Sequence, residues 1–200
     1  MLINLLNISP RVSFDISPRV SSQRACRASI SARDKSRHLS GSIPSEWGLL
    51  PLVNITLLGN RLTGPIPKEI GNIITLERLV LENNQLSGTL PPELGRLSNL
   101  KRLVLYASGL SGPIPLSIAH LTKLKDLMIS DMTGPEFFFP PLQSMTQMRQ
   151  LVLRNINLKG ELPSYLGTNT TNLTLLYLSG NMLNGSIPSW MSKEKDRDIM

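Results

Sequence analysis

Residues 76–99 read LERLVLENNQLSGTLPPELGRLSN, and residues 100–123 repeat the phrase as LKRLVLYASGLSGPIPLSIAHLTK. Leucines stand at the same places in both segments, and each segment has a glycine followed by an aliphatic residue and a proline. A fixed period of roughly 20–50 residues indicates a stack of similar units instead of one globular core. The fold therefore depends on how far this period continues along the chain.

The period continues in both directions from residues 76–99. The positions equivalent to Asn84 are separated by 24, 24, 24, 24 and 25 residues. They are Asn60, Asn84, Ser108, Met132, Ile156 and Asn181. An aliphatic residue stands three and five positions before each of them, and Leu or Met stands eight positions before. This spacing is the signature of leucine-rich repeats.

The signature predicts an α/β solenoid. Two apolar residues separated by one variable residue point to the same side of a short strand, so successive units stack as parallel strands about 4.8 Å apart. We expect this parallel sheet on the concave face. An asparagine at the turn can hydrogen-bond backbone groups that the turn leaves unpaired. Ser108 is expected to do so in part, and Met132 and Ile156 not at all.

Each turn is followed by the pattern L-x-G-x-I/L-P. It occurs at residues 62–67, 86–91, 110–115, 158–163 and 183–188, with a half-unit at 39–44. Proline holds the preceding residue extended, which predicts a short flank strand and then a 3-10 turn on the convex side. With this element, residues 39–191 resemble the plant-type leucine-rich repeats in ectodomains of receptor-like Ser/Thr kinases. The resemblance implies about six and a half units in one solenoid.

The segments outside the repeats differ in composition. Residues 1–38 are rich in Arg and Ser and hold seven basic and two acidic residues, so we expect disorder. They are either an organelle transit peptide or the chance N-terminus of a truncated reading frame. Because residues 26–36 contain no leucine, the half-unit at 39–44 is expected to lack a sheet strand. Residues 192–200 form a charged tail.

The net charge of +7 arises mostly outside the repeats. Residues 39–191 hold eleven basic and nine acidic residues, which leaves +2 for the solenoid. That argues against nucleic-acid binding, which needs a strongly basic folded face. No apolar run reaches the roughly 18 residues that span a bilayer.

One unit departs from the pattern, at SDMTGPEFFFPPLQSM (130–145). Its Gly134-to-Pro140 interval is six residues instead of three, yet the next unit returns to register. The sequence of residues 107–155 resembles that of one group of receptor kinases, whose repeats precede a malectin-like domain. We expect Phe138 to enter the core and Phe137 and Phe139 to face outward. Either all three phenylalanines pack against loop residues and Pro140 or Pro141, or Phe137 and Phe139 form an apolar binding patch.

Catalytic and metal-binding sets are absent from the sequence. His38 and His120 have no Ser, Cys or acid at a recognisable spacing, and no phosphate loop or kinase motif occurs. We therefore predict a non-catalytic protein without cofactor or metal, although the resembled family has a kinase domain.

The variable strand positions form the predicted binding surface. A central apolar column flanked by polar columns suits an extended peptide or a protein partner. The predicted contact residues are Arg78, Val80, Arg102, Tyr106, Asp126, Met128, Arg154 and Tyr177. The alternative is an ordinary solvated sheet whose valines reflect strand propensity.

N-glycosylation sequons agree with a secreted origin. They occur at Asn7, Asn54, Asn169, Asn172 and Asn184. By resemblance, we expect an extracellular or plasma-membrane recognition module for a peptide, protein ligand or co-receptor, with no nucleic-acid partner. Two other hypotheses stay open: a truncated product of a receptor-kinase locus, and a soluble inhibitor or decoy.

Overall fold

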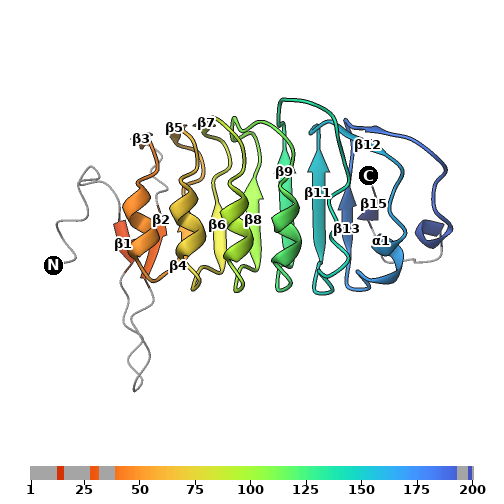
Figure 1. Ribbon diagram of the computed structural model, residues 1–200, viewed down its shortest axis with the longest axis horizontal. Helices are drawn as coiled ribbons and strands as arrows, with labels where there is room; N and C mark the ends of the chain where they lie inside the picture. The colour runs from red at the N-terminus through yellow and green to blue at the C-terminus, as the bar shows by residue number, and fades with distance from the viewer. Residues whose placement is uncertain (1–12, 16–27, 32–38, 193–197, 200) are drawn as a thin grey trace, which may run out of the picture.

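The computed structural model describes residues 13–15, 28–31, 39–192 and 198–199, which form coils stacked along one long axis (Figure 1). One strand from each coil enters a nine-stranded sheet, in which all pairs are parallel except β1 with β2. In spatial order the strands are β1 (Ser13–Asp15), β2 (Ala28–Ser31), β4 (Leu52–Thr56), β6 (Arg78–Val80), β8 (Arg102–Leu105), β9 (Asp126–Ser130), β11 (Gln150–Arg154), β13 (Leu175–Tyr177) and β15 (Asp198–Ile199).

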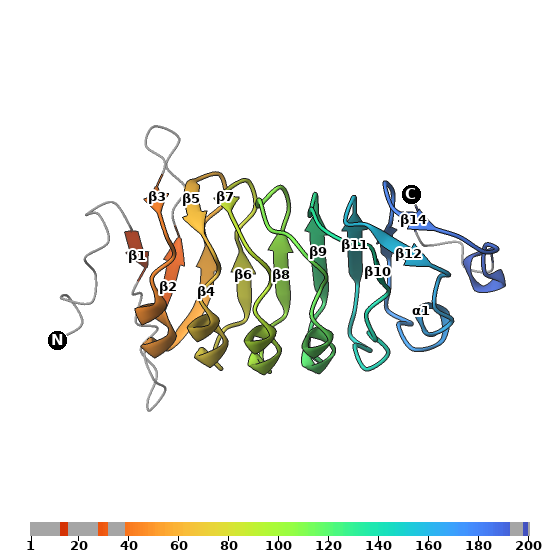
Figure 2. The ribbon, with the colours of Figure 1, turned by 45° about the horizontal axis from the view of Figure 1, so that its top comes forward.

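Two small flank sheets and a row of short helices complete the coils. The flank sheets are β3 (Ser40–Gly41), β5 (Arg61–Gly64) and β7 (Gln85–Leu86), and β10 (Phe137–Phe138), β12 (Leu158–Gly160) and β14 (Met182–Leu183). The helices are η2 (Ser45–Leu49), η3 (Lys68–Asn72), η4 (Pro92–Arg96), η5 (Leu116–His120), α1 (Tyr165–Thr168) and η6 (Ser189–Ser192). In Figure 2, η2 to η5 lie side by side in one row. All but α1 are 3-10 helices, as predicted for the repeat type.

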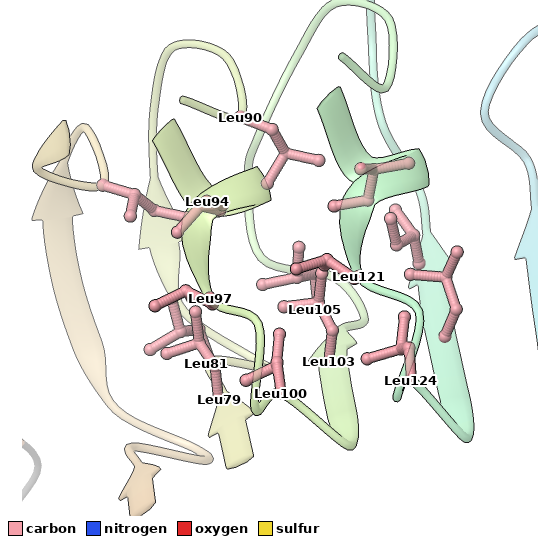
Figure 3. Packing of buried hydrophobic residues seen from close by; sticks show 14 of the residues in the cluster. Leu79, Leu81, Leu90, Leu94, Leu97, Leu100, Leu103, Leu105, Leu121 and Leu124 are labelled. Atoms are coloured by element: carbon pink, nitrogen blue, oxygen red, sulfur yellow. The ribbon is translucent and has the colours of Figure 1, made fainter. Parts of the chain in front are cut away.

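The repeated leucines fill the space between the sheet and the helices (Figure 3). Leu79 and Leu81 come from strand β6 and its end, whereas Leu94 comes from η4, and all three are at most 1% exposed. Burying one such side chain contributes on the order of 2 kcal/mol. The core is shared between neighbouring coils, so the stack gains stability that a single coil lacks. The predicted fold class is confirmed.

The turn asparagines bind backbone groups, as predicted, and the groups belong to two coils. Asn84 Oδ1 accepts a hydrogen bond from Leu62 N at 3.1 Å, and its Nδ2 donates to Leu81 O at 2.9 Å. Ser108 Oγ donates only to Leu105 O, at 3.1 Å. The apolar residues Met132 and Ile156 are buried and pack in the core instead.

Strand β2 differs from the expectation that residues 1–38 are disordered and that the first half-unit lacks a sheet strand. Ala28–Ser31 pair in parallel with β4, and Ile30 is fully buried beside Ile55. The segment ASIS alternates apolar and polar residues, which suits a strand with one buried face. A search for leucines misses this signal. Apart from β1 and β2, the Arg/Ser-rich segment, Cys26 and His38 included, lies outside the described residues, as does most of the charged tail.

The prediction for Phe137, Phe138 and Phe139 is wrong. Phe137 and Phe139 are partly buried and pack on the core, whereas Phe138 is 68% exposed. The register explains the inversion, because Phe137 pairs with buried Leu158 and Phe138 with Lys159. Phe137 thus takes the level of the leucine in the flank strand, and alternation turns Phe138 outward. An outward patch of Phe137 and Phe139 is therefore not formed.

Candidate functional site

The open face is the side of the nine-stranded sheet that points away from the leucine core. Strand register aligns its side chains in columns, as the sequence predicts. The first column is Asn54, Arg78, Arg102, Asp126, Gln150 and Leu175, and the central column is Thr56, Val80, Val104, Met128, Val152 and Tyr177. Five consecutive strands, β6 to β13, contribute seven of the eight predicted contact residues to one face, and Tyr106 follows directly after β8 on the same face.

The central column is less exposed than expected. Val80, Val104, Met128 and Val152 form a small apolar cluster and are only 2–8% exposed. Leu58, Tyr106, Leu175 and Tyr177 pack around this cluster. Side chains in register on strands about 4.8 Å apart cover one another, which leaves little of each for solvent. Val80 and Met128 therefore form the floor of the face, and contact with a partner falls to the flanking side chains.

Charged side chains occupy the first column. Arg102 Nη1 lies 2.9 Å from Asp126 Oδ2, and these side chains are 37% and 19% exposed. Arg78, one strand earlier, is exposed. At the start of the same strands, Lys101 Nζ lies 2.9 Å from Glu77 Oε2. The column therefore presents an exposed guanidinium beside an ion pair.

The third column, two positions after the central one, includes Tyr106, Ser130 and Arg154, so it carries hydroxyl groups and an arginine. Tyr106 is half-buried, and burial, together with the nearby Glu82 carboxylate, raises the pKa of its phenol. Tyr106 therefore stays a neutral hydrogen-bond donor at physiological pH. Ser130 is buried and Arg154 is exposed. Tyr177 is half-buried at the far end of the central column.

Sequence reasoning missed a polar cluster at the end of β9. Ser130 Oγ donates to Asp131 Oδ2 at 2.6 Å, and Asn155 Nδ2 donates to Asp131 Oδ1 at 2.9 Å. The hydrogen bond from Asn155, and to a lesser extent the one from Ser130, holds the pKa of Asp131 below its usual range. Asp131 and Asn155 have φ of 58° and 50°, a backbone region in which Asp and Asn are enriched. That preference is the signal that the sequence offered.

The predicted sequons occupy different surroundings. Asn54 lies half-buried on the open face, where its Nδ2 donates to Ser29 Oγ at 3.0 Å. Asn169, Asn172 and Asn184 are exposed near the C-terminal end of the stack. The sequon at Asn7 lies outside the described residues.

The described part of the chain offers little for catalysis. No group of three or more His, Cys, Asp or Glu that could hold a metal occurs among the described residues. His120 is exposed at the end of η5. Over the same residues, no helix is long and apolar enough to cross a bilayer.

Comparison with known proteins supports the leucine-rich repeat fold and shows a homologous plant receptor-like kinase. The family model described as Leucine Rich Repeat matches residues 75–97 and 172–193. A probable leucine-rich repeat receptor-like serine/threonine-protein kinase of Arabidopsis thaliana is 54% identical over 59 residues. That alignment covers 30% of this chain and 6% of the relative, so the chain spans a small part of the relative's length.

Two solved plant ectodomains share the architecture. One is the ectodomain of the Arabidopsis thaliana membrane receptor kinase GASSHO1/SCHENGEN3, in complex with CASPARIAN STRIP INTEGRITY FACTOR 2. It is 35% identical to this chain with a TM-score of 0.73, and the match covers 80% of this chain and 19% of that one. The Arabidopsis receptor kinase HAESA, in complex with the peptide hormone IDA and the co-receptor SERK1, is 30% identical with a TM-score of 0.65, over 82% of this chain and 31% of that one. This chain therefore has plant-type leucine-rich repeats and is homologous, in its aligned part, to plant leucine-rich repeat receptor-like kinases.

Proposed function

We propose that this chain is a non-catalytic recognition module that binds an extracellular peptide, a protein ligand or a co-receptor on its open face. The observation that carries the proposal is the strand register, which places an apolar floor between a charged column and a column with Tyr106 and Arg154. Aromatic and arginine side chains around an apolar centre are typical of binding surfaces. The two similar ectodomains are known in complex with a ligand, which supports the same use here.

The wider context follows from the homology. In this proposal, residues 39–191 act as one recognition domain at the outer side of the plasma membrane, flanked by the segments 1–38 and 192–200. A malectin-like domain and the kinase activity belong to other parts of a full-length receptor. The exposed Asn169, Asn172 and Asn184 carry glycans in the secreted protein, away from the central strands of the open face.

The experiment is selection of binders from a library of synthetic peptides by the 200-residue chain. Selected peptides are then tested against Tyr106→Ala/Arg154→Ala, which changes the open face. The matched control is Leu116→Ala/Lys68→Ala, which removes an exposed apolar and an exposed basic side chain on η5 and η3. We expect the open-face variant to lose at least about tenfold in affinity, as is typical when contact residues are truncated. Equal loss in both variants would place binding elsewhere.

A further inference from the structure

Basic side chains gather at one edge of the open face, where the central strands begin. These six, which we call the basic edge, are Arg78, Lys101, Arg102, Lys123, Lys125 and Arg149. Backbone hydrogen bonds align their coils: Lys125 N donates to Lys101 O at 2.8 Å, and Arg149 N donates to Lys125 O at 2.7 Å. The turns that hold Leu100 and Leu124, directly before Lys101 and Lys125, lie at the same end of neighbouring coils (Figure 3).

The charge of this edge is much larger than that of the solenoid. Six basic residues stand there with two acids, Glu77 and Asp126, which gives +4, whereas residues 39–191 carry +2 in total. Each acid already pairs with a cation of the edge, Lys101 or Arg102. Lys125 and Arg149 form no salt bridge with another described residue, and Arg149 is exposed. The edge therefore holds positive charge that its own acids do not neutralise.

The opposite end of the same strands has the other sign. Glu82 and Asp131 stand there with Arg154, which gives −1. Between the two ends lies the apolar floor of Val80, Val104, Met128 and Val152. A bound chain therefore meets positive charge on one side, apolar side chains in the middle and acidic groups on the other side.

We propose that the basic edge binds an extended acidic peptide segment that lies along the stack over β6, β8, β9 and β11. The proposal rests on the open face being the binding surface. Alternate residues of an extended peptide point to opposite sides, so acidic side chains face the edge while apolar ones face the floor. Four strands span roughly 14 Å, which an extended segment of about four or five residues covers.

The charge pattern favours a peptide over an acidic polysaccharide. A uniformly charged polymer gains attraction at the edge but presents no apolar side chain to the floor. It also meets Glu82 and the Asp131 carboxylate, whose pKa is lowered, if it extends across the sheet. A peptide with acidic residues on one side only avoids this repulsion.

The test uses the whole chain and the labelled peptide Glu-Val-Glu-Val-Glu-Val, with Lys-Val-Lys-Val-Lys-Val as its opposite. Binding is measured by fluorescence anisotropy. We expect the acidic peptide to bind, the basic one not to, and Lys125→Glu/Arg149→Glu to weaken binding at least about tenfold through reversal of two nearby charges. The control Arg61→Glu/Lys68→Glu makes the same charge change on β5 and η3, and we expect binding within about twofold of the unmodified chain.

The possible outcomes distinguish a failure of this proposal from a failure of the recognition function on which it rests. Equal weakening by both charge-reversal variants, or no binding of the acidic peptide, overturns the basic edge as an acidic-peptide site. If the acidic polysaccharide oligogalacturonate, at equal charge, displaces the acidic peptide completely, the proposal that the ligand is a peptide is overturned. If library peptides without acidic residues bind the open face while Glu-Val-Glu-Val-Glu-Val does not, the recognition function stands and this inference fails. Circular dichroism and the milder Lys125→Ala/Arg149→Ala check that lost binding is not lost folding.

Discussion

The side-chain amide of Asn84 lies 2.9 Å from Leu57 O in the preceding coil and 2.9 Å from Leu81 O in its own coil. One residue therefore satisfies buried carbonyl groups of two neighbouring coils. Asn181 repeats this arrangement toward Leu153 O and Leu178 O, at 2.6 and 2.8 Å. Such bonds fix the spacing of the coils, which in turn aligns the columns of the open face.

The first prediction concerns how much Asn84 contributes to the stability of the fold. We expect Asn84→Ala to lower the free energy of unfolding by on the order of 2–3 kcal/mol, because buried backbone groups lose their partners. The control Asn72→Ala removes an exposed amide at the end of η3, and we expect a change below about 0.5 kcal/mol. Urea unfolding followed by circular dichroism gives both values. Similar losses in the two variants would contradict the role of Asn84.

A second prediction concerns the close packing of the helical turns. A Cβ added to Gly95 would clash with Ser117 O in the next coil, because that backbone oxygen is too close for any side chain. We expect Gly95→Ala to destabilise the chain by about 1–3 kcal/mol through overpacking. The same turn provides a control, since Ser98 is exposed and Ser98→Ala adds no atom to the contact. An unchanged unfolding midpoint for Gly95→Ala would mean that the turns pack less tightly than described.

The ion pair of the first column can be measured directly. Arg102 and Asp126 are partly exposed, so we expect a double-mutant cycle with alanine to give a coupling energy of about 0.2–1 kcal/mol. The coupling should fall as salt is added, because ions screen exposed charges. A cycle that gives zero coupling at low salt, or coupling that grows with salt, is inconsistent with this pair.

The irregular unit is tied to the next coil through Tyr165, whose hydroxyl donates to Pro140 O at 2.5 Å. Burial raises the pKa of Tyr165 to about 12 from its ordinary 10.0. Because the folded chain keeps this proton at a pH where the unfolded chain releases it, stability falls as the pH rises from about 10 to about 12.

Spectrophotometric titration of the tyrosinate absorbance checks the alkaline prediction. We expect the tyrosine step near about pH 12 to disappear in Tyr165→Phe while the raised pKa of Tyr106 remains, together with a weaker loss of stability between about pH 10 and 12 in that variant. Tyr177→Phe is the comparison, because its half-buried ring lies on the open face. A step near about pH 12 that persists in Tyr165→Phe would assign the shift to another tyrosine.

Much of this fold could be predicted from the sequence because the repeat fixes both period and side-chain alternation. Leucine spacing predicted the strand register, and the turn positions predicted which residues bond the backbone, Ser108 included. The same reasoning failed where the period is interrupted. Phe138 was assigned to the position at which isoleucine normally enters the core, but β10 takes its register from Leu158 and Lys159 of the next coil.

The candidate site was predictable in position but not in exposure. Alternation places Val80 and Met128 on the open face, yet only the neighbouring side chains decide how much solvent reaches them. Ile30 was missed because it stands among serines without a leucine. The Asp131 cluster was missed because its bonds join residues in adjacent coils, which one repeat read alone does not reveal.

The central claim is that the open face is where this chain binds its partner. Amide hydrogen exchange, measured with and without a peptide selected from the library, tests it most directly. We predict slower exchange in β6, β8, β9 and β11 on binding, with η3, η4 and η5 unchanged. Protection confined to the helical turns or to the flank strands, with the central strands unaffected, would contradict the account.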